Sequence, residues 1–195
     1  MPHITCDKRF SRRVAGLEAS PIREMLSIID RPEMISFAGG LPAPETFPEI
    51  SLTGMPASCL QYGASEGDPE LRQAVADNLN ALGLACTPAQ VLILSGSQQG
   101  IDLVAKLFID AGTPVAVESP TYLAALQVFR YFGASFTPLD PDLPDAGLSA
   151  AARPAFAYAI PTFQNPTGRC YDAGQREVLA SACDALMVPL FEDDP

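Results

Sequence analysis

Short apolar runs alternate with helix-length segments from residue 91 to the end of the chain. A short continuous apolar run is typical of a buried strand, and apolar residues recurring every three to four positions are typical of an amphipathic helix. The pattern predicts strands at residues 91–94, 114–118, 135–139, 155–160 and 188–192, and helices at residues 98–110, 121–132 and 173–186. These repeated strand–helix–strand units predict an α/β fold, a three-layer sandwich in which helices cover both faces of a mostly parallel sheet.

The first 60 residues lack this alternation and are rich in proline. Residues 21–30 predict a short helix, because Ser20 can cap it and Pro21 suits its first turn. Glycine, proline and aromatic residues at positions 37–48 favour an irregular loop or arm. Residues 68–82 predict an amphipathic helix.

Charge and hydropathy exclude several classes of protein. The formal net charge is −11, and an acidic chain is a poor binder of a nucleic-acid backbone, which needs clustered Lys and Arg. No apolar run reaches the roughly 18 residues that span a membrane, and the N-terminus lacks the apolar segment of a secretory signal. An anionic small ligand is still compatible with this charge, because a helix N-terminus binds anions through backbone amides.

The cysteines and the histidine limit the kinds of metal site and catalytic site that the chain can form. The five cysteines are scattered and include no C-x-x-C pair: Cys6, Cys59, Cys86, Cys170 and Cys183. This spacing argues against a disulfide framework or a zinc site and favours a reducing cytoplasm. The single histidine, His3, lies at the N-terminus, which excludes most histidine-based metal sites and catalytic triads.

Polar loops follow four of the predicted strands, at the carboxyl ends where parallel α/β sheets bind ligands. The first loop, residues 95–100 (Ser-Gly-Ser-Gln-Gln-Gly), opens a helix. Backbone N–H groups and the helix dipole there suit a phosphate, and Gly96 allows close approach of the backbone. The same residues also fit a capping box between Ser95 and Gln98.

The second and third loops each carry a residue suited to a flat ring. Tyr122, in the sequence Glu-Ser-Pro-Thr-Tyr, could stack on such a ring, or it could pack in the core. Asn165, in residues 161–168 (Pro-Thr-Phe-Gln-Asn-Pro-Thr-Gly), could donate a hydrogen bond to a phenolic oxygen, or it could belong to an ordinary Asn-Pro turn. Pro166 fixes that turn and allows a cis peptide bond.

The fourth loop is the acidic end of the last strand, Glu-Asp-Asp-Pro at residues 192–195. A carboxylate there could hold a protonated ring nitrogen and raise its pKa by charge pairing, or it could be a solvated strand end. A parallel strand needs a crossover element to cover it, and none follows in the sequence. We therefore expect the chain to be incomplete at this end.

The order and placement of these loops resemble the class I and II aminotransferases, which are pyridoxal-phosphate-dependent enzymes of fold type I. The likeness is strongest to the subgroup that contains 2-aminoadipate and kynurenine aminotransferases, and the segments that carry it are residues 35–48, 60–63, 66–67 and 96–99. The resemblance runs from about Arg12 to Pro195. It implies an N-terminal arm and the start of a small domain at residues 1–50, and part of the cofactor-binding large domain at residues 51–195.

The resemblance implies an enzyme that moves an amino group between an amino acid and a 2-oxo acid, with pyridoxal 5′-phosphate as cofactor. Ser97 and Gln98 are expected to bind the cofactor phosphate. Tyr122 is expected to stack on the ring, Asn165 to bond its hydroxyl oxygen, and Asp193 to pair with its nitrogen.

Three further residues are assigned on the same resemblance. Tyr62 is expected to reach the phosphate in a neighbouring subunit, which implies a homodimer. On the substrate side, Gly40 is expected near the carboxylate, together with Asn165, and Arg23 near an acidic side chain. Aminoadipate, aromatic, branched-chain and alanine-type substrates all fit this pattern.

The Schiff-base lysine and the carboxylate-binding arginine of the family lie beyond Pro195. Lys8 and Lys106 are the two lysines of the sequence. Lys106 follows Asp102 by one helical turn and is expected to pair with it. We therefore expect no catalytic residue within the chain and no transaminase activity from the chain alone.

Three alternatives compete with this interpretation. The first is a gene fragment or pseudoenzyme without catalytic activity. The second is a transcription regulator that fuses a DNA-binding domain to an aminotransferase-like domain, although only about 20 residues precede Pro21, too few for such a domain. The third is a generic nucleotide-binding α/β protein, which would leave the Asn-Pro-Thr-Gly segment unexplained.

Overall fold

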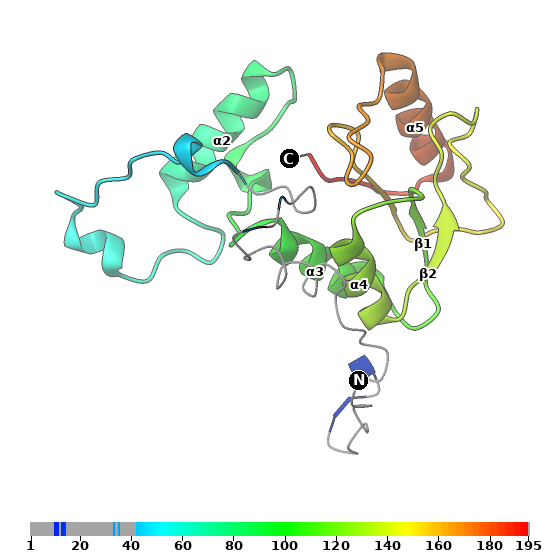
Figure 1. The fold of residues 1–195 in the computed structure, drawn as a ribbon, viewed down its shortest axis with the longest axis horizontal. Helices are drawn as coiled ribbons and strands as arrows, with labels where there is room; N and C mark the ends of the chain where they lie inside the picture. The colour runs from blue at the N-terminus through cyan, green and yellow to red at the C-terminus, as the bar shows by residue number, and fades with distance from the viewer. Residues whose placement is uncertain (1–9, 12, 15–32, 34, 36–41, 195) are drawn as a thin grey trace. The chain divides into compact units, whose positions relative to one another are not determined.

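The structure is a computed structural model that describes residues 10, 11, 13, 14, 33, 35 and 42–194 (Figure 1). The chain divides into two compact units: Glu18–Leu94, and Ser95–Pro195 together with Met1–Leu17. The helix predicted at residues 21–30 lies outside the described residues. Among the described helices, none is both long enough and apolar enough to cross a membrane.

Helix α2, Pro69–Ala81, is the longest helix among the described residues of the unit Glu18–Leu94. It begins there because the Asp68 carboxylate accepts hydrogen bonds from the N–H groups of Glu70 and Leu71, each at 3.0 Å. Short 3₁₀ helices occur at η2 Pro44–Thr46, η3 Ala57–Leu60 and η4 Pro88–Gln90. The prediction of a helix at residues 68–82 is confirmed.

The prediction of a strand at residues 91–94 is wrong. These residues belong to the same unit as α2 and form no ladder with another strand. The backbone groups of this segment bond elsewhere: the Arg72 guanidinium donates to the Val91 carbonyl at 2.9 Å, and the Ile93 N–H donates to the Glu66 carbonyl at 3.0 Å. Apolar composition alone could not reveal those partners.

The second unit contains a four-stranded sheet. Its strands are β1 Pro114–Val117, β2 Ser135–Pro138, β3 Ala157–Ala159 and β4 Leu190–Glu192. They lie in the order β2-β1-β3-β4, and all three pairings are parallel. The predicted parallel sheet is therefore confirmed, with strands slightly shorter than the apolar runs.

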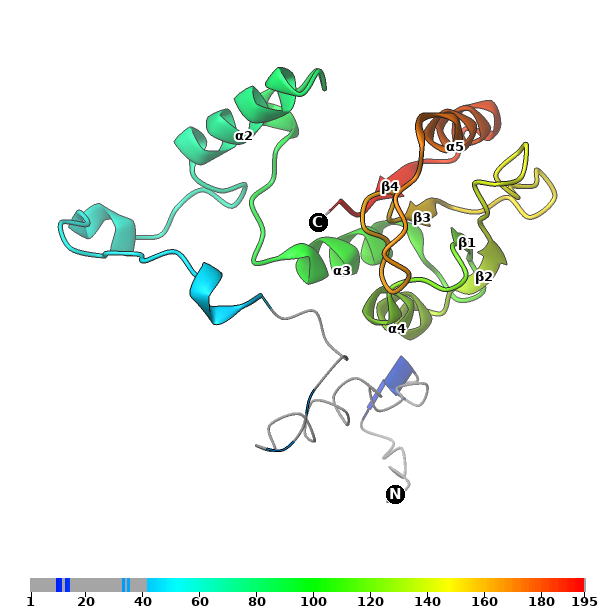
Figure 2. The ribbon, with the colours of Figure 1, turned by 45° about the horizontal axis from the view of Figure 1, so that its top comes forward.

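Within the described part of this unit, three helices cover the two faces of the sheet: α3 Ser97–Phe108, α4 Leu123–Phe132 and α5 Ala173–Leu186. Side chains of successive strand residues point to opposite faces. Val115, Val117 and Tyr158 therefore join a core cluster with α3 and α4, whereas Ala116 and Ala157 join a second cluster with α5. Figure 2 shows α5 on one side of the sheet and α3 and α4 on the other. The expected three-layer arrangement is confirmed.

Helix α5 matches its predicted bounds because a capping box defines its start. The Asp172 carboxylate accepts from the Gln175 N–H, and the Gln175 side chain accepts from the Asp172 N–H, both at 2.9 Å. The helix ends at Met187, which adopts a left-handed conformation with φ 51°. Local capping thus fixes the element that leads into β4.

Candidate functional site

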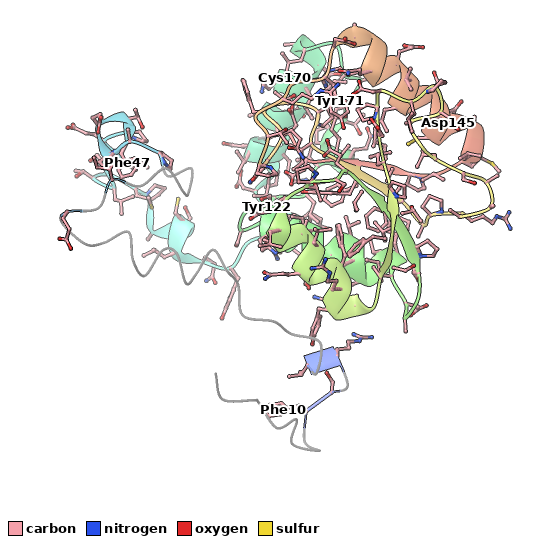
Figure 3. All side chains as sticks on the ribbon, turned by 45° about the vertical axis from the view of Figure 1, so that its right-hand side comes forward. Phe10, Phe47, Tyr122, Asp145, Cys170 and Tyr171 are labelled. Carbon is pink, nitrogen blue, oxygen red and sulfur yellow. The ribbon has the colours of Figure 1, made fainter. Side chains whose placement is uncertain are left out.

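One cavity of about 260 Å³ collects the loop ends of the sheet-containing unit. Its lining residues come from four separate loops and are Ser97, Tyr122, Ile160, Phe163, Asn165 and Asp193. Figure 3 labels Tyr122 where the chain enters α4. The structure therefore brings together four of the residues singled out from the sequence, one from each polar loop.

Ser97 lines the cavity as the first residue of α3. The residue before it, Gly96, has φ 95° and ψ 163°, a conformation that is almost exclusive to glycine. No side chain caps this helix end, so its first N–H groups remain for a ligand or water. The alternative capping box between Ser95 and Gln98 does not form. Instead the Ser95 N–H donates to the side chain of Gln99, at 2.8 Å.

Tyr122 occupies the position just before α4, Leu123–Phe132. Its side chain is half-buried and packs against the core cluster that α3 and α4 share with the sheet. The same side chain also lines the cavity. The Tyr122 ring can therefore pack against the core and still contact a ligand in the cavity, because the ring has two faces.

Asn165 lies in a loop that is anchored by its neighbour, Gln164. The Asn165–Pro166 peptide bond is cis, as the sequence allowed. The buried Gln164 side chain donates to the Pro120 carbonyl at 2.8 Å and accepts from the Thr167 N–H and hydroxyl at 2.9 and 2.6 Å. Gln164 therefore links the loop of Asn165 to the loop of Tyr122.

Glu118 provides a second link between these loops. Its buried carboxylate accepts from the Ile160 N–H at 2.9 Å and from the Tyr171 hydroxyl at 2.5 Å. Burial, and then the bond to Glu118, raise the pKa of Tyr171 above its usual range. Sequence reasoning missed the roles of Glu118 and Gln164. A charged residue at the end of a buried strand was the available signal for Glu118.

The acidic end of β4 contributes one carboxylate to the cavity, that of Asp193. The Asp193 N–H continues the ladder by donating to the Ala159 carbonyl at 2.9 Å. Its Oδ2 accepts from the Tyr158 hydroxyl at 2.6 Å. Glu192 instead meets Arg176 of α5, at 3.5 Å, because neighbouring strand residues face opposite sides of the sheet.

The remaining predicted residues lie elsewhere. Gln98 is exposed and is not among the lining residues of the cavity. Tyr62 belongs to the other compact unit, where its side chain is 99% exposed. Gly40 and Arg23 lie outside the described residues. Lys106 pairs with Asp102 on α3, which confirms the expected ion pair.

A larger cavity of about 330 Å³ lies beside β2, and none of the predicted residues that the structure describes is among its lining residues. The cation among its described lining residues, the Arg169 guanidinium, is bidentate to Asp142 at 2.9 and 2.7 Å. This bond lowers the pKa of Asp142 and, with help from Gln175, keeps the carboxylate charged. Because the guanidinium already has a carboxylate partner, the smaller cavity is the better candidate for a ligand site.

Comparison with known proteins identifies the family. The family profile described as "Aminotransferase class I and II" matches residues 36–194. The chain belongs to this aminotransferase family. All four of the cavity residues taken from the polar loops lie within the matched segment.

Individual relatives agree with this assignment. A 2-aminoadipate transaminase of Thermus thermophilus is 38% identical over 208 residues, which cover all of this chain and 51% of the relative. The crystal structure of a kynurenine aminotransferase of Pyrococcus horikoshii, in complex with PMP, superposes with a TM-score of 0.81 at 32% identity. That alignment covers 96% of this chain and 51% of the relative's chain.

A third relative belongs to a different functional class. An uncharacterized HTH-type transcriptional regulator of Bacillus subtilis is 32% identical over 141 residues, covering 69% of this chain and 29% of the regulator. The chain spans about half the length of the two aminotransferases. The alignment with the 2-aminoadipate transaminase therefore covers the whole of this chain, whereas the alignment with the regulator covers about two-thirds of it.

Proposed function

We propose that this chain contributes the cofactor-binding half of an aminotransferase that uses pyridoxal 5′-phosphate to move an amino group between an amino acid and a 2-oxo acid. The observation that carries the proposal is the single cavity lined by Ser97, Tyr122, Asn165 and Asp193. A helix start, an aromatic ring, an amide and a carboxylate meet there. The cofactor offers a matching phosphate, flat ring, ring oxygen and ring nitrogen.

The donor set of the cavity fits this cofactor in charge as well as in shape. The uncapped start of α3 offers backbone N–H groups and the positive end of a helix dipole, which suit a phosphate. The Asp193 carboxylate supplies negative charge for a ring nitrogen. Ile160 and Phe163 add apolar surface to the lining of the same cavity. A volume of about 260 Å³ suits a small ligand with one ring.

Each residue then has a defined task. The Ser97 hydroxyl and the first N–H groups of α3 bind the phosphate, while Tyr122 stacks on the ring and shields it from water. Asn165 donates to the ring oxygen. Asp193 holds a proton at the ring nitrogen, because a nearby carboxylate favours the charged pyridinium. When bound, the cofactor supplies an electron sink for the carbon–hydrogen bond that breaks.

Among the described residues, no lysine lines the cavity. The residues that do line it therefore bind and orient the cofactor. Gln98 belongs to the phosphate site, and Gly40 and Arg23 belong to the substrate side, near its carboxylate and an acidic side chain. Tyr62 reaches the cofactor phosphate of a second subunit, so the working form is a homodimer. The scattered cysteines support a cytoplasmic location.

A second candidate function is the aminotransferase-like domain of a transcription regulator. The match to the Bacillus subtilis regulator favours it. Such a domain would bind the same cofactor without turnover. The longer protein that contains this chain would distinguish the two: an aminotransferase converts an amino acid and a 2-oxo acid, whereas a regulator binds a DNA duplex.

The proposal is tested by binding of pyridoxamine 5′-phosphate to the chain, measured by calorimetry. This form of the cofactor already carries its amino group and needs no lysine to bind. We expect Asp193→Asn to weaken binding about tenfold or more, because it removes a charge-assisted hydrogen bond. The matched control is Asp194→Asn, one residue further on, whose side chain is exposed and is not among the lining residues. Absence of binding, or equal loss in both variants, would contradict the proposal.

A further inference from the structure

The register of β3 and β4 places Tyr158 close to Asp193. Tyr158 of β3 pairs with Phe191 of β4. Asp193 lies two residues after Phe191 and therefore points to the same face of the sheet. The Tyr158 hydroxyl closes the remaining gap and donates to Asp193 Oδ2, 2.6 Å away.

The Tyr158 ring is held in place by other aromatic rings. It is fully buried, at 0% exposure. Phe129 of α4 and Phe191 of β4 each contact it edge-on, with ring centroids 5.5 Å away in both cases. Full burial and contacts with these two rings leave the Tyr158 ring little freedom, so its hydroxyl has a fixed direction.

The hydroxyl of Tyr158 is a permanent donor. Burial, and then the hydrogen bond to Asp193, raise the pKa of Tyr158 above its usual range. Besides Asp193, the titratable groups whose charge acts on it are Tyr122 at the start of α4 and Glu118 at the end of β1. Tyr158 therefore keeps its proton at neutral and mildly alkaline pH.

Asp193 needs such a partner because its carboxylate stands at the end of a short strand and lines a cavity. A carboxylate has two oxygens, and each can accept hydrogen bonds. A donor fixed on Oδ2 sets the rotation of the side chain and leaves Oδ1 for a second partner. Tyr158 itself is not among the lining residues of the cavity.

We infer that Tyr158 is a positioning residue, which orients the Asp193 carboxylate so that its second oxygen meets the ring nitrogen of the bound cofactor. The inference rests on the proposed function. A well-directed carboxylate holds the pyridinium proton more tightly than a rotating one, since the strength of a hydrogen bond depends on its geometry. Tyr158 thereby acts on the cofactor without touching it.

The test uses pyridoxamine 5′-phosphate labelled at the ring nitrogen with a magnetically active isotope, bound to the chain and titrated with base in an NMR experiment. The nitrogen resonance reports whether the ring is protonated. We expect Tyr158→Phe, which keeps the aromatic packing, to move loss of the ring proton about one pH unit lower. Asp193→Asn should move it further in the same direction.

The matched control is Tyr171→Phe. Tyr171 is also a buried tyrosine that donates to a carboxylate, that of Glu118 at 2.5 Å, and it is not among the lining residues of the cavity. Its loss should leave the ring titration where it is in the wild-type chain. A general loosening of the core would shift both tyrosine variants alike, which would overturn the inference.

The remaining outcomes separate the inference from the proposed function. If Asp193→Asn shifts the titration and Tyr158→Phe does not, Asp193 contacts the ring nitrogen and the role of Tyr158 is refuted. If neither variant shifts it, or if the wild-type chain does not bind the probe, the proposed function fails and the inference fails with it. A shift in Tyr158→Phe and Asp193→Asn, but not in Tyr171→Phe, supports both.

Discussion

Gln164 donates a hydrogen bond from Nε2 to the carbonyl oxygen of Pro120, 2.8 Å away, and joins two loops that lie 44 residues apart in sequence. One loop leads into Tyr122 and the other contains Asn165. Because Gln164 is buried, water competes little for this bond. The relative position of Tyr122 and Asn165 therefore depends on the side chain of Gln164, which is not among the lining residues of the cavity.

Replacing Gln164 with leucine keeps most of the side-chain volume and removes its bonds to Pro120 and Thr167. We expect the free energy of unfolding to fall by about 2–3 kcal/mol, because buried polar partners are left unpaired. Urea denaturation measures this change. Gln98→Leu is the control, since Gln98 is exposed in the same unit, and its effect should stay within about 0.5 kcal/mol. Similar losses in the two variants would show that the link is unimportant.

Gly96→Ala tests the start of α3. An added Cβ would meet no atom within 4 Å, so the cost comes from the backbone and not from a clash. At φ 95° and ψ 163° we expect a loss of about 1–3 kcal/mol in the free energy of unfolding, together with weaker binding of pyridoxamine 5′-phosphate.

Gly63→Ala is the matched substitution. Gly63 also has open space around an added Cβ, but its φ is outside the range that disfavours other residues. It should leave the stability of the chain nearly unchanged. If Gly96→Ala were equally harmless, the helix start would not require glycine.

Alkaline titration tests the two buried tyrosines. The pKa of Tyr158 and that of Tyr171 are both raised in the folded chain, mainly by burial. The stability that these tyrosines contribute is present below the pKa of an unfolded tyrosine, about 10. It is lost at higher pH, because the unfolded chain then releases protons that the folded chain keeps.

Phenolate absorbance, recorded for the native and the denatured chain, measures this difference. We expect part of the signal of the five tyrosines to appear only on unfolding. Tyr158→Phe and Tyr171→Phe should each reduce that delayed part. Complete titration of the native chain near pH 10, without loss of structure, would contradict the expected shifts.

The sequence predicted the helices and the cavity well where the determinants are local. Asp172 and Gln175 cap α5 within one turn of each other, so the start of that helix is visible in the sequence. The four polar loops each follow an apolar run or open a helix, and parallel connection brings their ends to one edge of the sheet. Ser97 and Asp193 therefore share a cavity although they lie 96 positions apart along the chain.

The sequence could not predict contacts that depend on register or on distant partners. Residues 91–94 are apolar enough for a strand, but Arg72 and Glu66 take up their backbone groups. The bond between Tyr158 and Asp193 follows from the alignment of β3 with β4, which no local pattern specifies. Gln164 could not be distinguished from a surface glutamine before its loop was placed against Pro120.

The side chains of Glu192 and Asp193 point to opposite faces of the sheet. The alignment of β4 with β3 therefore decides which of the two carboxylates lies beside Tyr158. A slide of β4 by one residue would turn Glu192 toward Tyr158 and would turn Asp193 toward Arg176. The amino-acid composition and net charge would be unchanged, yet the longer side chain of Glu192 would then take the place of Asp193 in the lining of the cavity. Such an error in pairing β3 with β4 would therefore misplace the acid, and it would also turn Phe191 away from Tyr158 and the core.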